Sequence, residues 1–401
     1  MPDKGTAPKN FLTRTLFSSM VPFFILAHCV HHLVNALPVP MLPMIRNEFS
    51  LDYTRSGFVV SAFQISYGFA QLPSGWLADR LGARLVMTVG IVGVAVAGLL
   101  VGLSSSYLML LGALVLMGVL GGGYHPASAP VIINTVAPRN RGRALGLHMI
   151  GGSFSFFLAP IIAATIATVW GWRGPFIVMA VPTLIFGIVF YLILLRRGER
   201  RHHDAPGFMA PPAPATLQRH QVRHLVSFFI LAMFANFVFF SVVSFVPLYL
   251  VDHFQVSQEV AAATISFFYS SGIWAAPLAG YLSDRWGRAP VLLTACFLTG
   301  PAIYLLNFVP YGVGTATLLI AMGMLTYSCT TSAQAYIVEH LPERRRATVL
   351  GLFFFGNIEG SGLITPLLGY GIDHLGFFYS FSIAAAIMLA VTTFCAILLR
   401  D

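Results

Sequence analysis

The chain has 401 residues, of which 57% are hydrophobic and only 9% are charged, with 23 Lys and Arg against 14 Asp and Glu. Since a soluble globular chain carries about 25% charged residues, this composition excludes a water-soluble fold. The high apolar content also excludes intrinsic disorder, and four cysteines are too few for a disulfide-rich scaffold. The net charge of +9 leaves nucleic-acid binding to be decided by where the charges lie.

Twelve hydrophobic stretches are long enough to cross a bilayer core about 30 Å thick. They cover residues 16–38, 57–78, 85–104, 107–135, 144–169, 175–195, 225–250, 260–282, 290–309, 312–338, 347–371 and 376–399. The first stretch is too long for a signal-peptide core, so we expect it to be retained. The sequence predicts an all-α integral membrane protein with an N-terminal six-helix bundle at 1–195, a linker at 196–223 and a C-terminal six-helix bundle at 224–401.

The positions of the basic residues predict the orientation, because short loops rich in Lys and Arg stay in the cytoplasm. With the N-terminus inside, every Lys and Arg falls on the cytoplasmic side except Arg46, Arg55 and Arg173. Both termini and the linker are therefore expected in the cytoplasm. Acidic lipid headgroups of the bilayer are the expected counter-charge, so nothing in the charge calls for nucleic acid.

An internal repeat relates the two halves. The run "LPSGWLADRLGARLVM" from Leu72 matches "APLAGYLSDRWGRAPVLL" from Ala276 at an offset of 205 residues, and "PRNRGRALGL" from Pro138 matches "PERRRATVLGL" from Pro342 at nearly the same offset. Spans 1–6 and 7–12 are thus two copies of one unit in the same orientation. Such parallel halves, related by an axis along the membrane normal, favour a rocker-type carrier with its substrate site between them.

The doubled loop motif, the twelve spans and the central linker together resemble the major facilitator superfamily of secondary transporters. The resemblance implies that the two loops form a cytoplasmic gate, latched while the carrier is open outward. Its glycines are expected to allow close approach and tight turns, and its acids to face Arg side chains and a helix N-terminus. The alternative is that the arginines only set topology. The predicted gate residues are Gly75, Asp79, Arg80, Gly82, Arg84, Gly280, Asp284, Arg285, Gly287 and Arg288.

Polar groups at membrane depth usually face the protein interior or a wet cavity. In span 4, Pro126 and Pro130 of "GGGYHPASAP" are expected to break the helix, while His148 of span 5 is read as an interhelical hydrogen-bonding group. The predicted substrate cavity is lined by polar and aromatic side chains, namely His31, Asn35, Gln64, Tyr67, Tyr124, His125, Asn236, Phe240, Trp274, Tyr327, Gln334 and Asn357.

Glu359 is the acid predicted to lie deep within a span, and a buried carboxyl group has a raised pKa, so it is the proposed proton carrier. His28 and His32, on one helical stripe with Asn35, are predicted to take part in proton coupling. The alternatives are a Glu359 that only makes structural hydrogen bonds and histidines that only join helices.

The run "HCVHH" at residues 28–32 also has the spacing of a histidine box in membrane di-iron desaturases, but two irons need many more ligands than one box provides. No second box is present. The sequence therefore predicts no enzyme activity, no metal site and no cofactor, with metal carriage through a His-lined cavity left as an alternative.

Within the superfamily, residues 118–160 resemble the span 4–5 region of fosmidomycin-resistance-type efflux carriers, on the element Tyr124, His125 and Pro126. The chain departs from many drug/proton antiporters of the superfamily, because span 4 lacks their R-x-x-Q-G pattern and span 5 has Ala159-Pro160 as the nearest match to their G-P-x-x-G-G element. The absence of a deep Lys or Arg disfavours a paired-Arg anion clamp. We expect a monomeric, proton-coupled carrier of small organic solutes in a bacterial cytoplasmic membrane, with efflux favoured. The alternatives are a proton symporter importing an organic acid and a receptor that does not transport.

Overall fold

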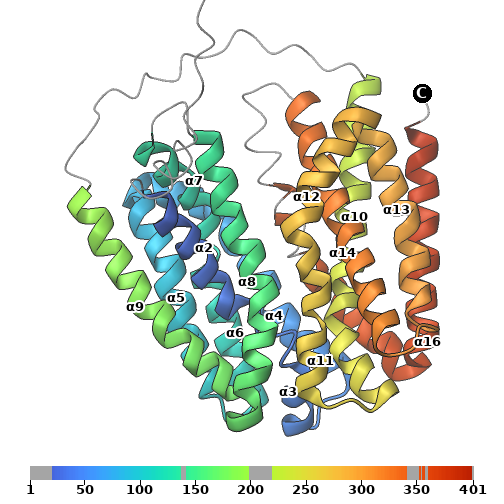
Figure 1. Cartoon of the computed structure of the whole chain (residues 1–401), viewed down its shortest axis with the longest axis horizontal. Coiled ribbons are helices and arrows are strands. Elements are labelled where there is room, and N and C mark those ends of the chain that lie inside the picture. Colours follow the sequence, from blue (N-terminus) through green and yellow to red (C-terminus); the bar gives the residue numbers. More distant parts are fainter. Residues whose placement is uncertain are drawn as a thin grey trace, which may run out of the picture.

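The structure is a computed structural model that describes residues 20–136, 141–197, 219–340, 352–353, 355–356 and 360–399. These residues are helical apart from short connections, and no β-strand occurs among them. The helices form two groups, α2–α9 and α10–α16, that stand side by side (Figure 1). Their bounds are α2 (Val21–Asn35), α3 (Leu42–Phe49), α4 (Tyr53–Leu81), α5 (Ala83–Gly102), α6 (Tyr107–Gly121), α7 (Tyr124–Thr135), α8 (Arg141–Trp170), α9 (Arg173–Arg197), α10 (Arg219–Phe254), α11 (Gln258–Thr264), α12 (Ser266–Trp286), α13 (Arg288–Leu305), α14 (Val313–His340) and α16 (Ser361–Leu398).

The helices confirm the predicted twelve-span, all-α fold. Eight stretches of the described chain are long and apolar enough to cross a membrane, and α6 with α7 forms one of them. Another is α16, which supplies two spans because Gly376, with φ of 77°, breaks it in the middle. The remaining spans are the short apolar α2 and the less apolar α4 and α12. Ile185, Leu367 and Phe394 leave 59–69% of their surface exposed, as expected of side chains that face lipid.

The bundle has two ends. At the linker end, α9 ends at Arg197 and α10 begins at Arg219. The other end is called the opposite end. Three helices begin at the opposite end behind a side-chain cap, because Asp52, Ser106 and Ser257 each accept the backbone N–H three residues on, at 2.6–3.3 Å. Such caps satisfy donors that have no partner within the helix.

The predicted break in span 4 coincides with the first of its two prolines. The helical hydrogen-bond ladder is interrupted at Gly122 and Gly123, between α6 and α7, although both glycines keep right-handed helical φ and ψ angles. Pro126 has no N–H to donate to the Gly122 carbonyl four residues back. Pro130 lies inside α7, which continues past it. An interruption is therefore present before Pro126, whereas Pro130 does not end the helix.

The internal repeat is visible in the backbone. Gly82 ends α4 with φ of 92°, Gly287 ends α12 with φ of 94°, and the next helix begins at the following residue in both cases. Positive φ favours glycine because it has no Cβ. The two copies of the loop motif thus build the same tight turn at the linker end, one in each group of helices.

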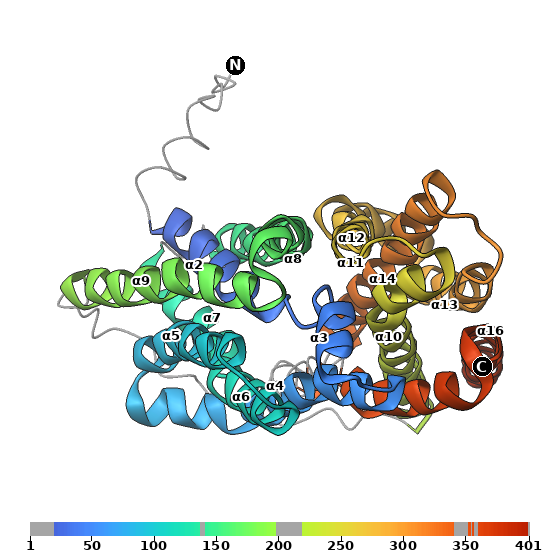
Figure 2. The ribbon, with the colours of Figure 1, turned by 90° about the horizontal axis from the view of Figure 1, so that it is seen from below.

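The packing differs between the two ends. Toward the opposite end, one cluster of buried apolar side chains draws on both groups and includes Phe176 and Phe245. Nearer the linker end the buried side chains form two separate clusters, one around Phe24 in the first group and one around Phe228 in the second. The ribbons diverge in the same direction (Figure 1), and α3 lies between the groups at the opposite end, against α10 and α11 (Figure 2).

Candidate functional site

Five histidines gather within the first group of helices. His28, His31 and His32 lie on α2, His125 on α7 and His148 on α8. Their rings stack or tilt against one another, with centroids 4.2 Å apart for His28 and His148 and 5.2 Å apart for His32 and His125. The predicted stripe on span 1 therefore meets two further rings from spans 4 and 5, and His148 belongs to the cluster as well.

His28 and His148 are held by the same kind of contact. The Nδ1–H of His28 donates to the backbone carbonyl of His148 at 2.8 Å, and the Nδ1–H of His148 donates to the carbonyl of Phe24 at 3.0 Å. A carbonyl can only accept, so these bonds assign the proton to Nδ1 and leave Nε2 as an acceptor. The Nε2 atoms of both rings are buried and have no hydrogen-bond partner among the described residues.

His31 is fully engaged by its neighbours. Its Nδ1–H donates to the carbonyl of Gly90 at 3.2 Å, and its Nε2 lies 3.0 Å from both the Tyr67 hydroxyl and the Asn35 amide nitrogen. Its ring stacks on Tyr124 at 4.3 Å. Both nitrogens have partners and none of the residue is exposed. The arrangement makes His31 a ring that positions Tyr67 and Asn35.

His32 and His125 lie on the side of the cluster that faces the second group. Their Nε2 atoms are 3.2 Å apart, and His125 is partly exposed. The His32 ring lies 4.8 Å from Phe156 of α8, which stacks at 5.3 Å on Tyr269 of α12. The histidine cluster thus reaches the boundary between the two groups through one aromatic ring.

The predicted cavity residues of the second half lie in several environments. Asn236 is buried and bonded within its own group, donating to the Ala232 carbonyl at 2.9 Å. Phe240 packs against Phe268 with ring centroids 6.0 Å apart. Tyr327 and Gln334 are partly buried, and Trp274 is 42% exposed. Asn357 and Glu359 lie outside the described residues.

One predicted cavity residue joins the two groups directly. Gln64 of α4 accepts a hydrogen bond from the Ser361 hydroxyl of α16 at 2.9 Å, and Ser61, one turn earlier, donates to the Gly362 carbonyl at 2.5 Å. Both contacts lie on the half of α4 toward the opposite end. The polar surface of α4 is therefore closed against α16 on that side.

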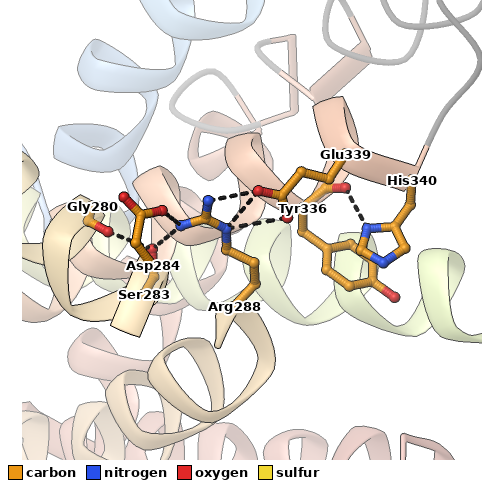
Figure 3. Close-up of polar contacts among 7 residues, drawn as sticks. All are labelled: Gly280, Ser283, Asp284, Arg288, Tyr336, Glu339 and His340. Carbon is orange, nitrogen blue, oxygen red and sulfur yellow. Dashed lines mark hydrogen bonds and ion pairs between the residues drawn. The ribbon is translucent and has the colours of Figure 1, made fainter. Parts of the chain in front are cut away.

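The gate motif of the second half forms a compact ion-pair network at the linker end (Figure 3). Arg288 contacts Asp284 at 2.5 Å and Glu339 of α14 at 2.6 Å, and it donates to the Ser283 hydroxyl at 2.5 Å. The hydrogen bond from Arg288 lowers the pKa of Glu339 below its ordinary value of 4.5. All of these residues belong to one group, so the network ties α12, α13 and α14 together.

The first copy of the motif is arranged differently. Arg80 lies over the Trp76 ring at 4.4 Å, and Arg84 donates to the Leu194 carbonyl at 3.4 Å. Among the side chains that the structure describes, Asp79 forms no ion pair, and no ion pair connects the two groups at the linker end. A Cβ on Gly75 would meet no described atom within 4 Å. Among the described residues, no neighbouring helix therefore makes the close approach expected of Gly75.

Two crossing contacts at the opposite end were not predicted. Arg46 of α3 forms a bidentate ion pair with Asp252 of α10, in which Nη2 of Arg46 lies 2.6 Å from Oδ1 of Asp252. The Tyr53 hydroxyl donates to the same carboxylate at 2.6 Å. Asp373 of α16 accepts the backbone N–H groups of Tyr53 and Thr54, each at 2.9 Å. No sequence signal pairs these residues, because each pair is about 200–320 positions apart in two different halves.

A membrane-embedded protein with twelve helices in two repeated groups, joined at one end and divergent at the other, belongs to the class of secondary carriers. Comparison with known proteins gives the family. The profile described as Major Facilitator Superfamily matches residues 24–274 and, separately, 228–401. The chain is a member of the Major Facilitator Superfamily, as its motifs predicted.

Curated relatives include both resistance proteins and substrate transporters. The chain is 24% identical to the fosmidomycin resistance protein of Escherichia coli (strain K12), covering 97% of this chain and 94% of that one. It is 23% identical to the hexuronate transporter of Bacillus subtilis (strain 168), covering 90% and 89%. Among solved structures, an inward-facing, occupied bacterial homologue of the human lysosomal transporter Spinster matches with a TM-score of 0.74, 16% identity and coverage of 98% and 96%.

Proposed function

We propose that this protein moves a small organic solute by alternating access, coupled to protons, with its linker end in the cytoplasm. The observation that carries the proposal is the asymmetry between the two ends. A shared apolar core and the Arg46–Asp252 ion pair close the opposite end, whereas the buried clusters separate toward the linker end. A carrier open to the cytoplasm has this arrangement, and the reverse state requires the crossing contacts to break.

The distribution of arginine supports the orientation. Among the described residues, the helix ends at the linker end carry ten arginines, whereas the opposite end carries three. Those at the linker end are Arg80, Arg84, Arg141, Arg143, Arg196, Arg197, Arg219, Arg223, Arg285 and Arg288. Basic loops remain on the cytoplasmic side. The relatives are bacterial, so we place the protein in a bacterial cytoplasmic membrane, as a monomer.

The solute site is proposed between the groups, with Gln64, Tyr67 and His125 of the first half and Tyr327 of the second as lining residues. Tyr269 of the second half stacks on Phe156, which lies against His32. Glu359 is the proposed proton carrier. In the sequence it directly precedes Gly360 and Ser361, and Ser361 contacts Gln64 across the two groups, so the described residues next to it change their surroundings when the groups separate. His28 and His32 were predicted to share proton coupling, but their contacts suggest a different chemistry, described below.

Efflux is the proposed direction, because the relative that the span 4–5 region resembles is a resistance protein. The transporters of hexuronate and glycerol 3-phosphate among the relatives carry names of anionic solutes. In the spans that the structure describes, Lys and Arg occur only near helix ends, which disfavours an anion clamp at membrane depth.

Proteoliposomes with a pH-sensitive dye inside test the proposal. Under an imposed proton gradient, an exporter moves protons against the solute, and fosmidomycin and a hexuronate are the first two solutes to compare. We expect Glu359→Gln to abolish solute-dependent proton movement and Glu259→Gln, at the start of α11, to leave it unchanged. Solute transport without proton movement, and unchanged in Glu359→Gln, would show that the coupling proposal is wrong.

A further inference from the structure

We propose that His28, His32 and His125 form a binding site for a divalent transition-metal ion of the zinc class. One ring nitrogen from each of the three lies within 4.8 Å of the others. Two of the rings come from α2 and one from α7, so an ion here would join spans 1 and 4. Neutral imidazole is a preferred ligand for zinc, nickel and copper ions.

The distances fit such an ion. Zinc binds imidazole nitrogen at about 2.0–2.1 Å, so two ligand nitrogens of a tetrahedral site lie roughly 3.3–3.4 Å apart. The Nε2 atoms of His32 and His125 are already 3.2 Å apart. The ligand nitrogen of His28 lies within 4.8 Å of the other two, so binding of an ion requires this third nitrogen to approach them.

The protonation of His28 also fits. Its Nδ1–H donates to the carbonyl of His148, and a backbone carbonyl on the second nitrogen is the usual partner of a metal-binding histidine, because it fixes the tautomer and orients the ring. The Nε2 that this leaves is buried and without a partner among the described residues. A plain hydrogen bond between His32 and His125 does not account for this atom.

The surroundings keep the ring of His28 in place. Gly152 of α8 has no side chain, and a Cβ built there would lie 2.7 Å from the His28 Nε2. The missing side chain thus makes room for the His28 ring, whose Cε1 would be the nearest atom to that Cβ, at 2.5 Å. Three neutral ligands leave the charge of the ion uncompensated, so a fourth, anionic ligand is expected, either hydroxide or an acidic group of a solute.

The test is metal binding by the full chain, purified in detergent with a tag that contains no histidine and stripped with a chelator. Co²⁺ is the probe, because its visible absorption reports tetrahedral ligands, and Zn²⁺ content after dialysis gives the stoichiometry. We expect one ion per chain. His28→Gln and His125→Gln should each weaken binding by at least about 10–100-fold, the loss that follows even from removing an outer partner of a metal ligand.

Three further variants distinguish binding at this site from binding elsewhere in the chain. The double variant His202→Gln, His203→Gln removes the adjacent histidines of the linker and should bind as the parent does. Gly152→Ala should weaken binding by crowding His28. His125→Cys should keep the ion and add a thiolate-to-cobalt absorption band, which shows that a variant at this position still folds.

Several results would overturn the proposal. These are no ion bound to folded protein, binding that survives both His28→Gln and His125→Gln, binding that is lost in the linker double variant, or bound Co²⁺ without the new band in His125→Cys. None of these readouts depends on transport, so the outcome is independent of the proposed function.

Discussion

Arg46 and Asp252, which are 206 positions apart in the chain, join the two groups of helices by a bidentate ion pair at the opposite end. Their side chains retain only 15% and 26% exposure, so the pair is shielded from most of the solvent. The Tyr53 hydroxyl supplies a third donor to the same carboxylate. This is the polar contact that most directly holds one end of the carrier closed.

A double-mutant cycle measures the strength of this contact. Removing either charge leaves its partner partly buried without its ion pair, so Arg46→Gln and Asp252→Asn should each destabilise the closed protein by about 1–3 kcal/mol. The double variant should cost less than the sum of the two. Thermal unfolding in detergent gives the three values.

The matched control for this cycle is the exposed pair Arg55 and Asp52 at the same end of the molecule, 3.8 Å apart with 62% and 47% exposure. Its coupling should be about 0–0.5 kcal/mol. Equal coupling in the two pairs would contradict the special role of Arg46 and Asp252.

Helix contact at the opposite end depends on a glycine of α4. A Cβ on Gly57 would lie 2.8 Å from the Cα of Pro366 in α16, whereas a Cβ on Gly75 of the same helix would meet no described atom within 4 Å. We expect Gly57→Ala to push α4 away from α16 and to expose a cysteine introduced at Ser61, on a background without the four native cysteines. Labelling by a membrane-impermeant maleimide should rise severalfold.

Gly75→Ala is the control for this experiment, since it makes the same change in the same helix. It should leave the labelling of the Ser61→Cys position unchanged. Similar rates in both glycine variants would mean that helix propensity, and not the contact with Pro366, sets the opening.

The Arg288–Glu339 pair predicts a pH dependence of stability. The folded pKa of Glu339 is lowered by its bond with Arg288, so the ionised carboxylate stabilises the fold at pH values above its unfolded pKa. That contribution is lost as the pH falls through the lowered folded pKa. The unfolding temperatures of the parent and of Glu339→Gln should therefore differ at neutral pH and converge below about pH 4.

Because Glu339 is 46% exposed, the difference should be small and should shrink in high salt. Glu259→Gln, which leaves the pair intact, should show no such convergence. A difference between parent and Glu339→Gln that stays constant down to about pH 3, below the ordinary glutamate pKa, would contradict the ion-pair account.

Much of the fold could be predicted because each membrane span is marked by a continuous run of apolar residues in the sequence. Span 4 was predicted at 107–135, and α6 with α7 covers the same residues. The tight turns at Gly82 and Gly287 followed from the repeated motif. An interruption of span 4 was expected at both Pro126 and Pro130, but only Pro126, which cannot donate to the Gly122 carbonyl, coincides with one, and α7 continues through Pro130.

The contacts between halves could not be predicted in this way. That Asp373 of α16 binds the first backbone amides of α4 depends on how two distant helices pack. For the histidines, one part of the arrangement could be predicted and another could not. The stripe of His28, His32 and Asn35 was readable from spacing, whereas its meeting with His125 and His148 required the arrangement of three helices.

Alternating access is tested most directly by distances at both ends in one protein. Spin labels at Asn47 and Gln255 report the opposite end, and labels at Leu81 and Trp286, which occupy matching places in the repeat, report the linker end; all four positions are exposed. Asp252→Asn should lengthen the first distance and shorten the second in the same fraction of molecules. Lengthening at the opposite end with no change at the linker end would contradict the account.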